Sequence, residues 1–162
     1  MVNIRLLNQD DWQSWKNLRL EALQNAPHTF GASIEEVYTL DKKDFQTLLS
    51  KNKIFGAFLN AQLIGCVGFY VLNSLKTQHR GVLWGMYVTP EHRGKNIAGS
   101  LVDAVISYAK SSVEQLNLKC VTANHSAVKL YQKHGFKIYG TEPRALKVDN
   151  KYYDEYIMVL EL

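Results

Sequence analysis

The chain has 162 residues, of which 46% are hydrophobic and 21% are charged, as in a single folded domain that buries a core. Its formal net charge of +4 is too mild to favour nucleic-acid binding, and no apolar run approaches the roughly 20 residues of a membrane span. The N-terminus lacks the features of a signal peptide, so we expect a cytoplasmic protein without nucleic-acid or membrane partners.

The N-terminal third predicts a short strand followed by helical segments. Residues 3–7 are typical of a strand, and the polar run NQDD can cap a helix that Pro27 would end. Apolar residues in this helix recur at helical spacing: Trp12, Trp15, Leu18 and Ala22. Ser33 followed by Glu36 predicts a capping box for a second helical segment, and residues 42–52 predict a further helical piece.

The rest of the chain predicts mainly strands, with two helices between them. The strand-like runs are residues 53–60, 63–72, 82–88, 117–123, 136–142 and 152–162, and the helical runs are 97–112 and 126–134. The turn at 60–62 indicates a hairpin, Gly135 is placed as a helix C-cap, and a loop around 148–151 joins the last two strands. The strand–helix–strand order in the middle indicates a parallel crossover. We therefore expect one α/β domain over residues 1–162, with a mixed sheet and helices on its faces.

A basic turn, HRGKNIA at residues 92–98, joins a predicted strand to a predicted helix. The N-terminus of a helix presents N–H groups without intrahelical partners, and Arg93 and Lys95 add positive charge, so this turn could hold a pyrophosphate. The turn matches neither GxxxxGK[ST] nor GxGxxG. An ordinary turn with solvated basic residues remains the alternative.

A second candidate stretch is NHSAVKLYQKHGF at residues 124–136. Asn124 ends a predicted strand, and Tyr131 lies on the following helix. On these residues alone, Asn124 could equally be a helix cap and Tyr131 a core aromatic.

Together, the patterns VxPExRGxxIAxxL (residues 88–101) and NxxAxxLYxxxGF (residues 124–136) resemble the GCN5-related N-acetyltransferase (GNAT) superfamily. The order of predicted elements is similar over essentially the whole chain. This resemblance implies a mixed, mostly antiparallel sheet of about seven strands with about four helices. It also implies acetyl-CoA as co-substrate, an amine acceptor and a homodimer.

The resemblance assigns a set of residues to the coenzyme. The backbone N–H groups of the phosphate loop would hold the pyrophosphate, the end of the preceding strand would pair with the pantetheine arm, and Asn124 would bind that arm. Asn96 stands where the family usually has glycine, but asparagine tolerates unusual backbone angles well. The implied coenzyme residues are Met86, Tyr87, Val88, Arg93, Gly94, Lys95, Asn96, Ile97, Ala98, Asn124 and Tyr131.

The implied catalytic residues include an acid but lack the usual base. Tyr131 would protonate the departing thiolate, whereas Gly85 occupies the place where many family members carry a glutamate. We expect Glu35 or Glu36 to act as the base, because the family lines its acceptor mouth with that region. His79, Asp154, Glu155 and a water chain remain alternatives.

The expected acceptor pocket comprises segments 27–33, 74–80 and 143–153 with aromatic residues, among them Phe30, Trp84 and Tyr152. Cys66 and Cys120 lie within strand-like runs without metal-ligand spacing, so we expect free buried thiols, no metal site and no acetyl-cysteine intermediate.

We thus expect an acetyl-CoA-dependent N-acetyltransferase, in which a primary amine attacks the thioester directly in a ternary complex. The acceptor could be a small molecule, such as an amino acid, a polyamine or an amino antibiotic, or it could be a protein amine. The alternative is a non-catalytic coenzyme-A-binding sensor or interaction domain, which the departures at Gly85 and Asn96 bring into consideration.

Overall fold

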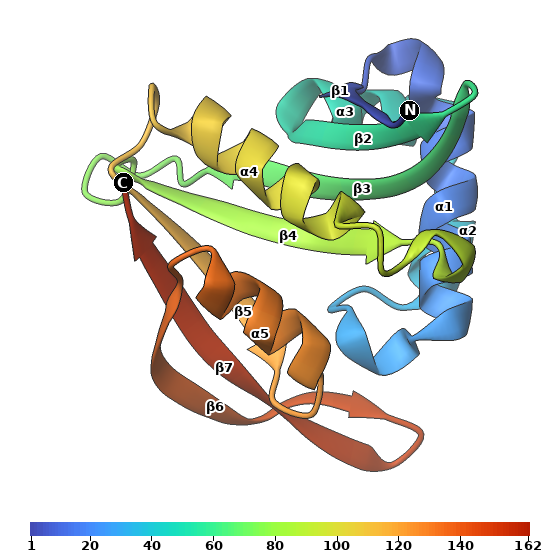
Figure 1. Ribbon diagram of the computed structural model, residues 1–162. Coiled ribbons are helices and arrows are strands. Elements are labelled where there is room, and N and C mark those ends of the chain that lie inside the picture. Colours follow the sequence, from blue (N-terminus) through green and yellow to red (C-terminus); the bar gives the residue numbers. More distant parts are fainter.

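A seven-stranded sheet forms the centre of the computed structural model, which describes residues 1–162 (Figure 1). Its strand order is β1-β2-β3-β4-β5-β7-β6, and every neighbouring pair is antiparallel except the parallel pair β4–β5. The strands are β1 (Asn3–Leu6), β2 (Lys53–Leu59), β3 (Gln62–Val71), β4 (Arg80–Val88), β5 (Gln115–Val121), β6 (Lys137–Val148) and β7 (Lys151–Glu161). The expected mixed, mostly antiparallel α/β sheet with one parallel crossover is confirmed.

Five α-helices and three short 3-10 turns accompany the sheet. The helices are α1 (Trp12–Asn25), α2 (Ile34–Tyr38), α3 (Lys42–Lys51), α4 (Ile97–Ala109) and α5 (His125–Lys133). The 3-10 turns are η1 (Gln9–Asp11), η2 (Pro27–Thr29) and η3 (Pro90–His92). Ser33 and Glu36 form the predicted capping box of α2, since each side chain accepts a hydrogen bond from the other residue's backbone N–H.

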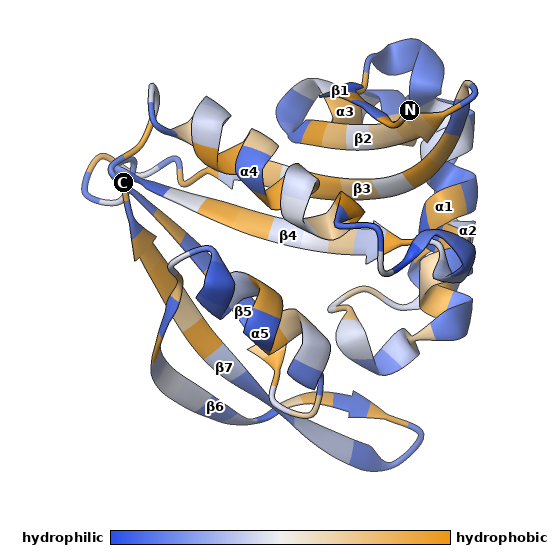
Figure 2. Cartoon of the chain, viewed as in Figure 1, coloured by the Kyte–Doolittle hydropathy of each residue, from blue (hydrophilic) through white to orange (hydrophobic).

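The helices cover the two faces of the sheet separately. On one face α4 and α5 pack onto the central strands through buried residues such as Leu101, Val105 and Val128. On the other face α1 and α3 pack onto the sheet through Trp15 and Phe45, whose rings meet edge to face. Figure 2 shows apolar residues concentrated on the central strands, whereas the turn between β4 and α4 is hydrophilic.

Strands β4 and β5 separate after a short parallel pairing. Their register covers only Arg80–Val82 against Gln115–Asn117, and beyond these residues the two strands diverge (Figure 1). A β-bulge also interrupts the pairing of β3 with β4, where Gly85 has a φ of +66°. The open end of the sheet that results lies beside η2, which contacts both β5 and β6.

Strand β6 is longer than expected, whereas β7 has the expected length and begins one residue earlier. The segment 143–148, expected as part of a hairpin loop, belongs to β6, and only Asp149 and Asn150 form the turn to β7. Both turn residues have positive φ, which suits a two-residue turn that follows the right-handed twist of the strands. The turn between β2 and β3 is equally short, because Gln62 already belongs to β3.

Candidate active site

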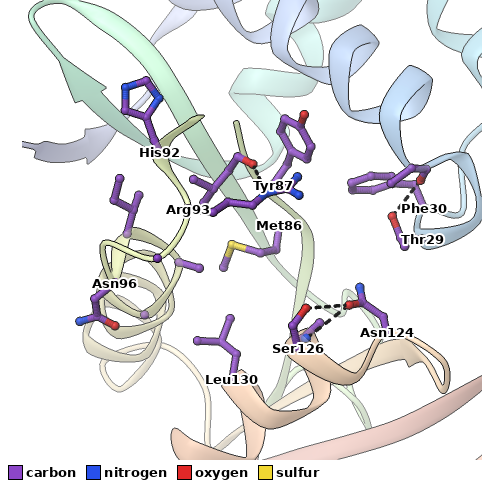
Figure 3. A pocket seen from close by; sticks show the side chains of 17 residues that line it. Thr29, Phe30, Met86, Tyr87, His92, Arg93, Asn96, Asn124, Ser126 and Leu130 are labelled. Carbon is purple, nitrogen blue, oxygen red and sulfur yellow. Dashed lines mark hydrogen bonds between the residues drawn. The ribbon is translucent and has the colours of Figure 1, made fainter. Parts of the chain in front are cut away.

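A cavity of about 460 Å³ occupies the space where β4 and β5 diverge. Its walls come from the end of β4, the N-terminus of α4, the start of α5 and the segment around η2 (Figure 3). Nine of the eleven expected coenzyme residues line it: Met86, Tyr87, Val88, Arg93, Gly94, Asn96, Ile97, Ala98 and Asn124. Lys95 and Tyr131 are the two that do not.

The turn from β4 into α4 presents unpaired backbone donors to this cavity. None of the N–H groups of residues 94–99 has an acceptor within the protein, because α4 begins at Ile97 and the preceding turn supplies none. Gly94 and Asn96 both have positive φ, of 77° and 58°. Asparagine is among the residues that adopt this left-handed conformation most readily, so Asn96 maintains the turn without glycine. The free N–H groups and the helix dipole together make this turn suitable for a phosphate group.

The side chain of Arg93 is exposed but is held against the end of β4. Its Nε donates a hydrogen bond of 3.0 Å to the carbonyl oxygen of Val88, and its guanidinium lies 5.5 Å from the centre of the Tyr87 ring. Lys95 is exposed and lies outside the cavity wall. Arg93 therefore contributes a positioned charge beside the free N–H groups of the turn.

Asn124 caps α5 and also faces the cavity. Its Oδ1 accepts hydrogen bonds from the backbone N–H of Ala127, at 3.4 Å, and from the hydroxyl of Ser126, at 3.2 Å (Figure 3). Its Nδ2 donates to no group in the protein, so the amide retains two donors for a ligand. The helix cap and the predicted ligand contact are thus compatible, since they use different atoms of one side chain.

Tyr131 lies in the core beside the cavity. Its ring meets Phe136 edge to face, and only 6% of the residue is exposed. Its hydroxyl forms no hydrogen bond with another protein group. Burial raises the pKa of this phenol, so the side chain stays protonated at neutral pH. The neighbouring Leu130 forms the adjacent part of the cavity wall.

A hydrogen-bonded group of three side chains joins the end of β4 to α1. The Tyr87 hydroxyl donates to Glu21 Oε2 at 2.8 Å and accepts from Asn25 Nδ2 at 2.9 Å. Burial raises the pKa of Tyr87, and the Glu21 carboxylate raises it further. Tyr87 also lines the cavity, so the side chain of Tyr87 alone connects the Glu21 carboxylate to the cavity wall.

The structure does not bring the two expected bases to the cavity. Glu35 and Glu36 are both exposed on α2, neither lines the cavity, and the Glu36 carboxylate accepts the backbone N–H of Ser33. Of the alternatives, His79 precedes β4 at its far end, and Asp154 accepts a hydrogen bond from the backbone N–H of Arg144. Glu155 is partly buried on β7, and burial raises its pKa.

The three expected acceptor aromatics lie in different environments. Phe30 lines the cavity, with its ring centre 6.3 Å from that of Tyr87. Trp84 lies under α1 outside the cavity wall, and its indole N–H is buried without a partner. Tyr152 is exposed near the end of the β6–β7 hairpin, where the Arg144 guanidinium lies 4.3 Å from its ring centre.

Several residues of the site were not named individually from the sequence, although Thr29 lies in the expected segment 27–33 and His92 in the basic turn 92–98. Thr29, His92, Ser126 and Leu130 line the cavity, and Glu21 and Asn25 reach it through Tyr87. Ser126 and Leu130 lie on the helix of the second motif, so the helical spacing could have indicated them. Glu21 and Asn25 carry no such signal, because only the packing of α1 on β4 brings them to Tyr87.

The two cysteines expected as free buried thiols have a counterpart in the structure. Cys66 and Cys120 are free and buried. No group of three or more His, Cys, Asp or Glu side chains is arranged to hold a metal ion. No helix is both long enough and apolar enough to cross a membrane.

Comparisons with known proteins agree with this arrangement. The model of the Acetyltransferase (GNAT) family matches residues 12–136. Spermidine N(1)-acetyltransferase of Vibrio cholerae serotype O1 is 28% identical over 94 residues, which cover 57% of this chain and 53% of that enzyme. The match thus spans only about half the length of that relative.

Solved structures share the fold over the whole chain. An acetyltransferase of the GNAT family from Streptococcus pneumoniae superposes with a TM-score of 0.90 at 23% identity and covers 100% of both chains. The Salmonella typhimurium protein yncA, solved with its cofactor acetyl-CoA, has a TM-score of 0.87 at 16% identity and covers 100% of this chain and 94% of its own. An N-acetyltransferase from Staphylococcus aureus Mu50 has a TM-score of 0.82 at 22% identity and covers 99% and 98%.

Proposed function

Because the chain belongs to the GNAT acetyltransferase family, we propose that it is a single-domain N-acetyltransferase that binds acetyl-CoA in the cavity between β4 and β5. The acetyl group passes to a primary amine by direct attack in a ternary complex. The observation that carries this proposal is the run of unpaired N–H groups at residues 94–99, which opens into the same cavity as the end of β4 and Asn124.

The residues present fit the chemical groups of coenzyme A. The N–H groups of the β4–α4 turn and the Arg93 charge suit the pyrophosphate, and the free amide donors of Asn124 suit the carbonyl groups of pantetheine. Bound acetyl-CoA would supply an activated acetyl group as a thioester. A Cβ on Gly94 would meet no atom within 4 Å, so a substituent there has space, and the positive φ is the constraint.

Tyr131 is the proposed acid for the departing thiolate. Its hydroxyl has no partner in the protein, and the raised pKa of this phenol keeps the proton available until a thiolate develops. A covalent acetyl-cysteine route is disfavoured, because burial raises the pKa of both Cys66 and Cys120 to about 11 and leaves them as unreactive thiols.

The Glu21–Tyr87 pair supports a route for the amine's proton. Glu21 is the carboxylate that hydrogen-bonds directly to a residue of the cavity wall, whereas Glu35 and Glu36 lie outside that wall. A proton from the attacking amine would pass to the Tyr87 hydroxyl as that hydroxyl gives its own proton to Glu21. This route does not require a side chain at Gly85.

A thiol-release assay over a panel of primary amines tests the proposed function. The enzyme releases free coenzyme A only when an acceptor is present, and the acetylated amine appears in equal amount. Tight acetyl-CoA binding without turnover of any amine would instead support a non-catalytic coenzyme-A sensor.

A further inference from the structure

The guanidinium of Arg19, on α1, is a partly buried charge without a partner. It forms neither an ion pair nor a hydrogen bond with any protein group, in contrast to Arg5, whose guanidinium pairs with Asp11 at 2.8 Å. Burial lowers the pKa of Arg19, yet a guanidinium remains charged in proteins. An unpaired charge removed from water is unfavourable, so this position favours a ligand that brings an anion.

Two indole rings hold the Arg19 guanidinium in place. Its central carbon lies 5.5 Å from the ring centre of Trp15 and 5.2 Å from that of Trp84. Cation–π contacts of this kind use no hydrogen-bond acceptor, so the N–H groups of the guanidinium remain available to a ligand. The side chain is therefore oriented before any ligand binds.

Arg19 lies directly over Gly85, where the family usually has its base. A Cβ built on Gly85 would lie 3.5 Å from Arg19 Nη1, and no other heavy atom would lie within 4 Å. Arg19 and Gly85 line a small hollow of about 10 Å³ together with Phe30 and Tyr87, which also line the larger cavity. That volume is about the size of one water molecule or one carboxylate oxygen. The hollow and the larger cavity thus share Phe30 and Tyr87 in their walls, and Arg19 lies on the hollow's side of these two residues.

We propose that Arg19 determines acceptor specificity by binding the carboxylate of an amino-acid acceptor. The inference rests on the proposed function, since it assumes that the amine attacks a thioester held at the end of β4. A guanidinium donates charge-assisted N–H···O bonds to a carboxylate, and such a bond to the one oxygen that fits the hollow orients the acceptor. The amine then points toward Met86 and Tyr87, and Phe30 packs against the acceptor's side chain.

The charges around the hollow favour an acceptor that carries a carboxylate. Glu21, two residues further along α1, directs its carboxylate to the Tyr87 hydroxyl, so it does not neutralise Arg19. A polyamine would place a second cation beside Arg19, where like charges repel. The site therefore selects a carboxylate-bearing amine over a polyamine, although the matched Vibrio relative carries the name of a spermidine acetyltransferase.

Paired acceptors test this inference through thiol release. The assay compares each common L-amino acid with its carboxamide, which keeps the amine and side chain but lacks the carboxylate, and includes spermidine. We expect the wild-type protein to prefer the best amino acid over its carboxamide by about 10- to 100-fold in kcat/KM, the usual range for a charge-assisted hydrogen-bonded pair. Arg19→Met should abolish that preference by raising KM for the acid, and Arg19→Lys should restore part of it.

Controls separate recognition from loss of folding. Lys16→Met removes another cation of α1, whose Nζ lies 5.7 Å from the Phe45 ring centre and away from the cavity, and it should leave the preference unchanged. Each variant must also bind acetyl-CoA and melt cooperatively. Wild-type protein that acetylates carboxamides or spermidine as well as amino acids would overturn the inference.

If no amine is turned over, a binding experiment tests the role of Arg19. Calorimetry with the N-acetylated amino acids in the presence of coenzyme A should detect binding to the wild-type protein, and Arg19→Met should weaken it by about tenfold or more. Binding without turnover would count against the proposed function but support the role of Arg19. No binding of any N-acetylated amino acid to the wild-type protein would overturn the role of Arg19, even if acetyl-CoA binds.

Discussion

The hydroxyl of Tyr87, near the end of β4, donates a hydrogen bond of 2.8 Å to the carboxylate of Glu21 on α1. The two residues are 66 positions apart in the chain, and the packing of α1 on the sheet brings them together. Their contact connects a cavity-lining residue to an acidic group, which is the connection that Gly85 cannot provide.

Replacement of Glu21 by glutamine tests this connection. Glutamine keeps a hydrogen-bond acceptor for Tyr87 but cannot accept the amine's proton. We expect Glu21→Gln to lower kcat by about 10²-fold and to alter the acidic limb of the pH–rate profile. A larger loss in Glu35→Gln or Glu36→Gln than in Glu21→Gln would return the role of base to α2.

Replacement of Tyr131 by phenylalanine removes the proposed acid and little else. Because the hydroxyl has no hydrogen-bond partner in the protein, its removal should change the free energy of unfolding by less than about 1 kcal/mol. We expect kcat to fall by about 10²-fold or more while the affinity for acetyl-CoA stays nearly constant. Steady-state kinetics and calorimetry measure the two effects, and an unchanged kcat would remove the role.

The two functions of Asn124 can be separated by substitution. Serine is a good helix N-cap but lacks the amide donors, so Asn124→Ser should keep the melting temperature and weaken acetyl-CoA binding several-fold. Asn124→Ala should lower both, with a loss of about 1 kcal/mol in unfolding free energy. If Asn124→Ser binds acetyl-CoA as tightly as the wild type does, Asn124 serves only as a cap.

Much of this architecture could be predicted from local sequence patterns. The capping box at Ser33 and Glu36, the parallel crossover and the free thiols follow from short-range spacing and polarity, which local physics largely determines. Most coenzyme candidates also lie in two short segments next to helix N-termini. Such segments keep their geometry because the chain itself positions adjacent residues.

The acceptor side was harder to predict because it depends on tertiary packing. Arg19 lies one helical turn after Trp15, within the stripe of α1 that also buries Leu18, Ala22 and Leu23. A charge in an otherwise apolar stripe is visible in the sequence, yet Arg19 was not among the predicted acceptor residues. The absence of a glutamate at Gly85 also has a conformational reason, since its positive φ at the β-bulge disfavours any side chain there.

The two thiols give the protein a specific sensitivity to alkaline pH. Burial raises the pKa of Cys66 and Cys120 from an ordinary value near 9 to about 11. A raised pKa contributes stability that is complete below the ordinary value and is lost as the pH rises through the folded value. We expect the free energy of unfolding to fall between about pH 9 and 11, by on the order of 2–3 kcal/mol for Cys66.

Urea unfolding at several pH values, with and without Cys66, measures this effect. Cys66→Ala should be less stable than the wild type at pH 7, because it leaves a small cavity, but its stability should decline less toward pH 11. If the free energies of unfolding of the two proteins decline in parallel toward pH 11, this result would contradict a raised pKa at Cys66.

The most direct test of the whole account is an NMR titration of the uniformly ¹⁵N-labelled protein with acetyl-CoA. If the β4–α4 turn holds the pyrophosphate, the backbone amides of residues 94–99 and the Asn124 side-chain amide should show the largest shifts, with saturation at one equivalent. Asn96→Gly should keep this pattern, because glycine adopts the same left-handed conformation. Shifts confined to other surfaces, or no shifts on saturation with acetyl-CoA, would contradict the assignment.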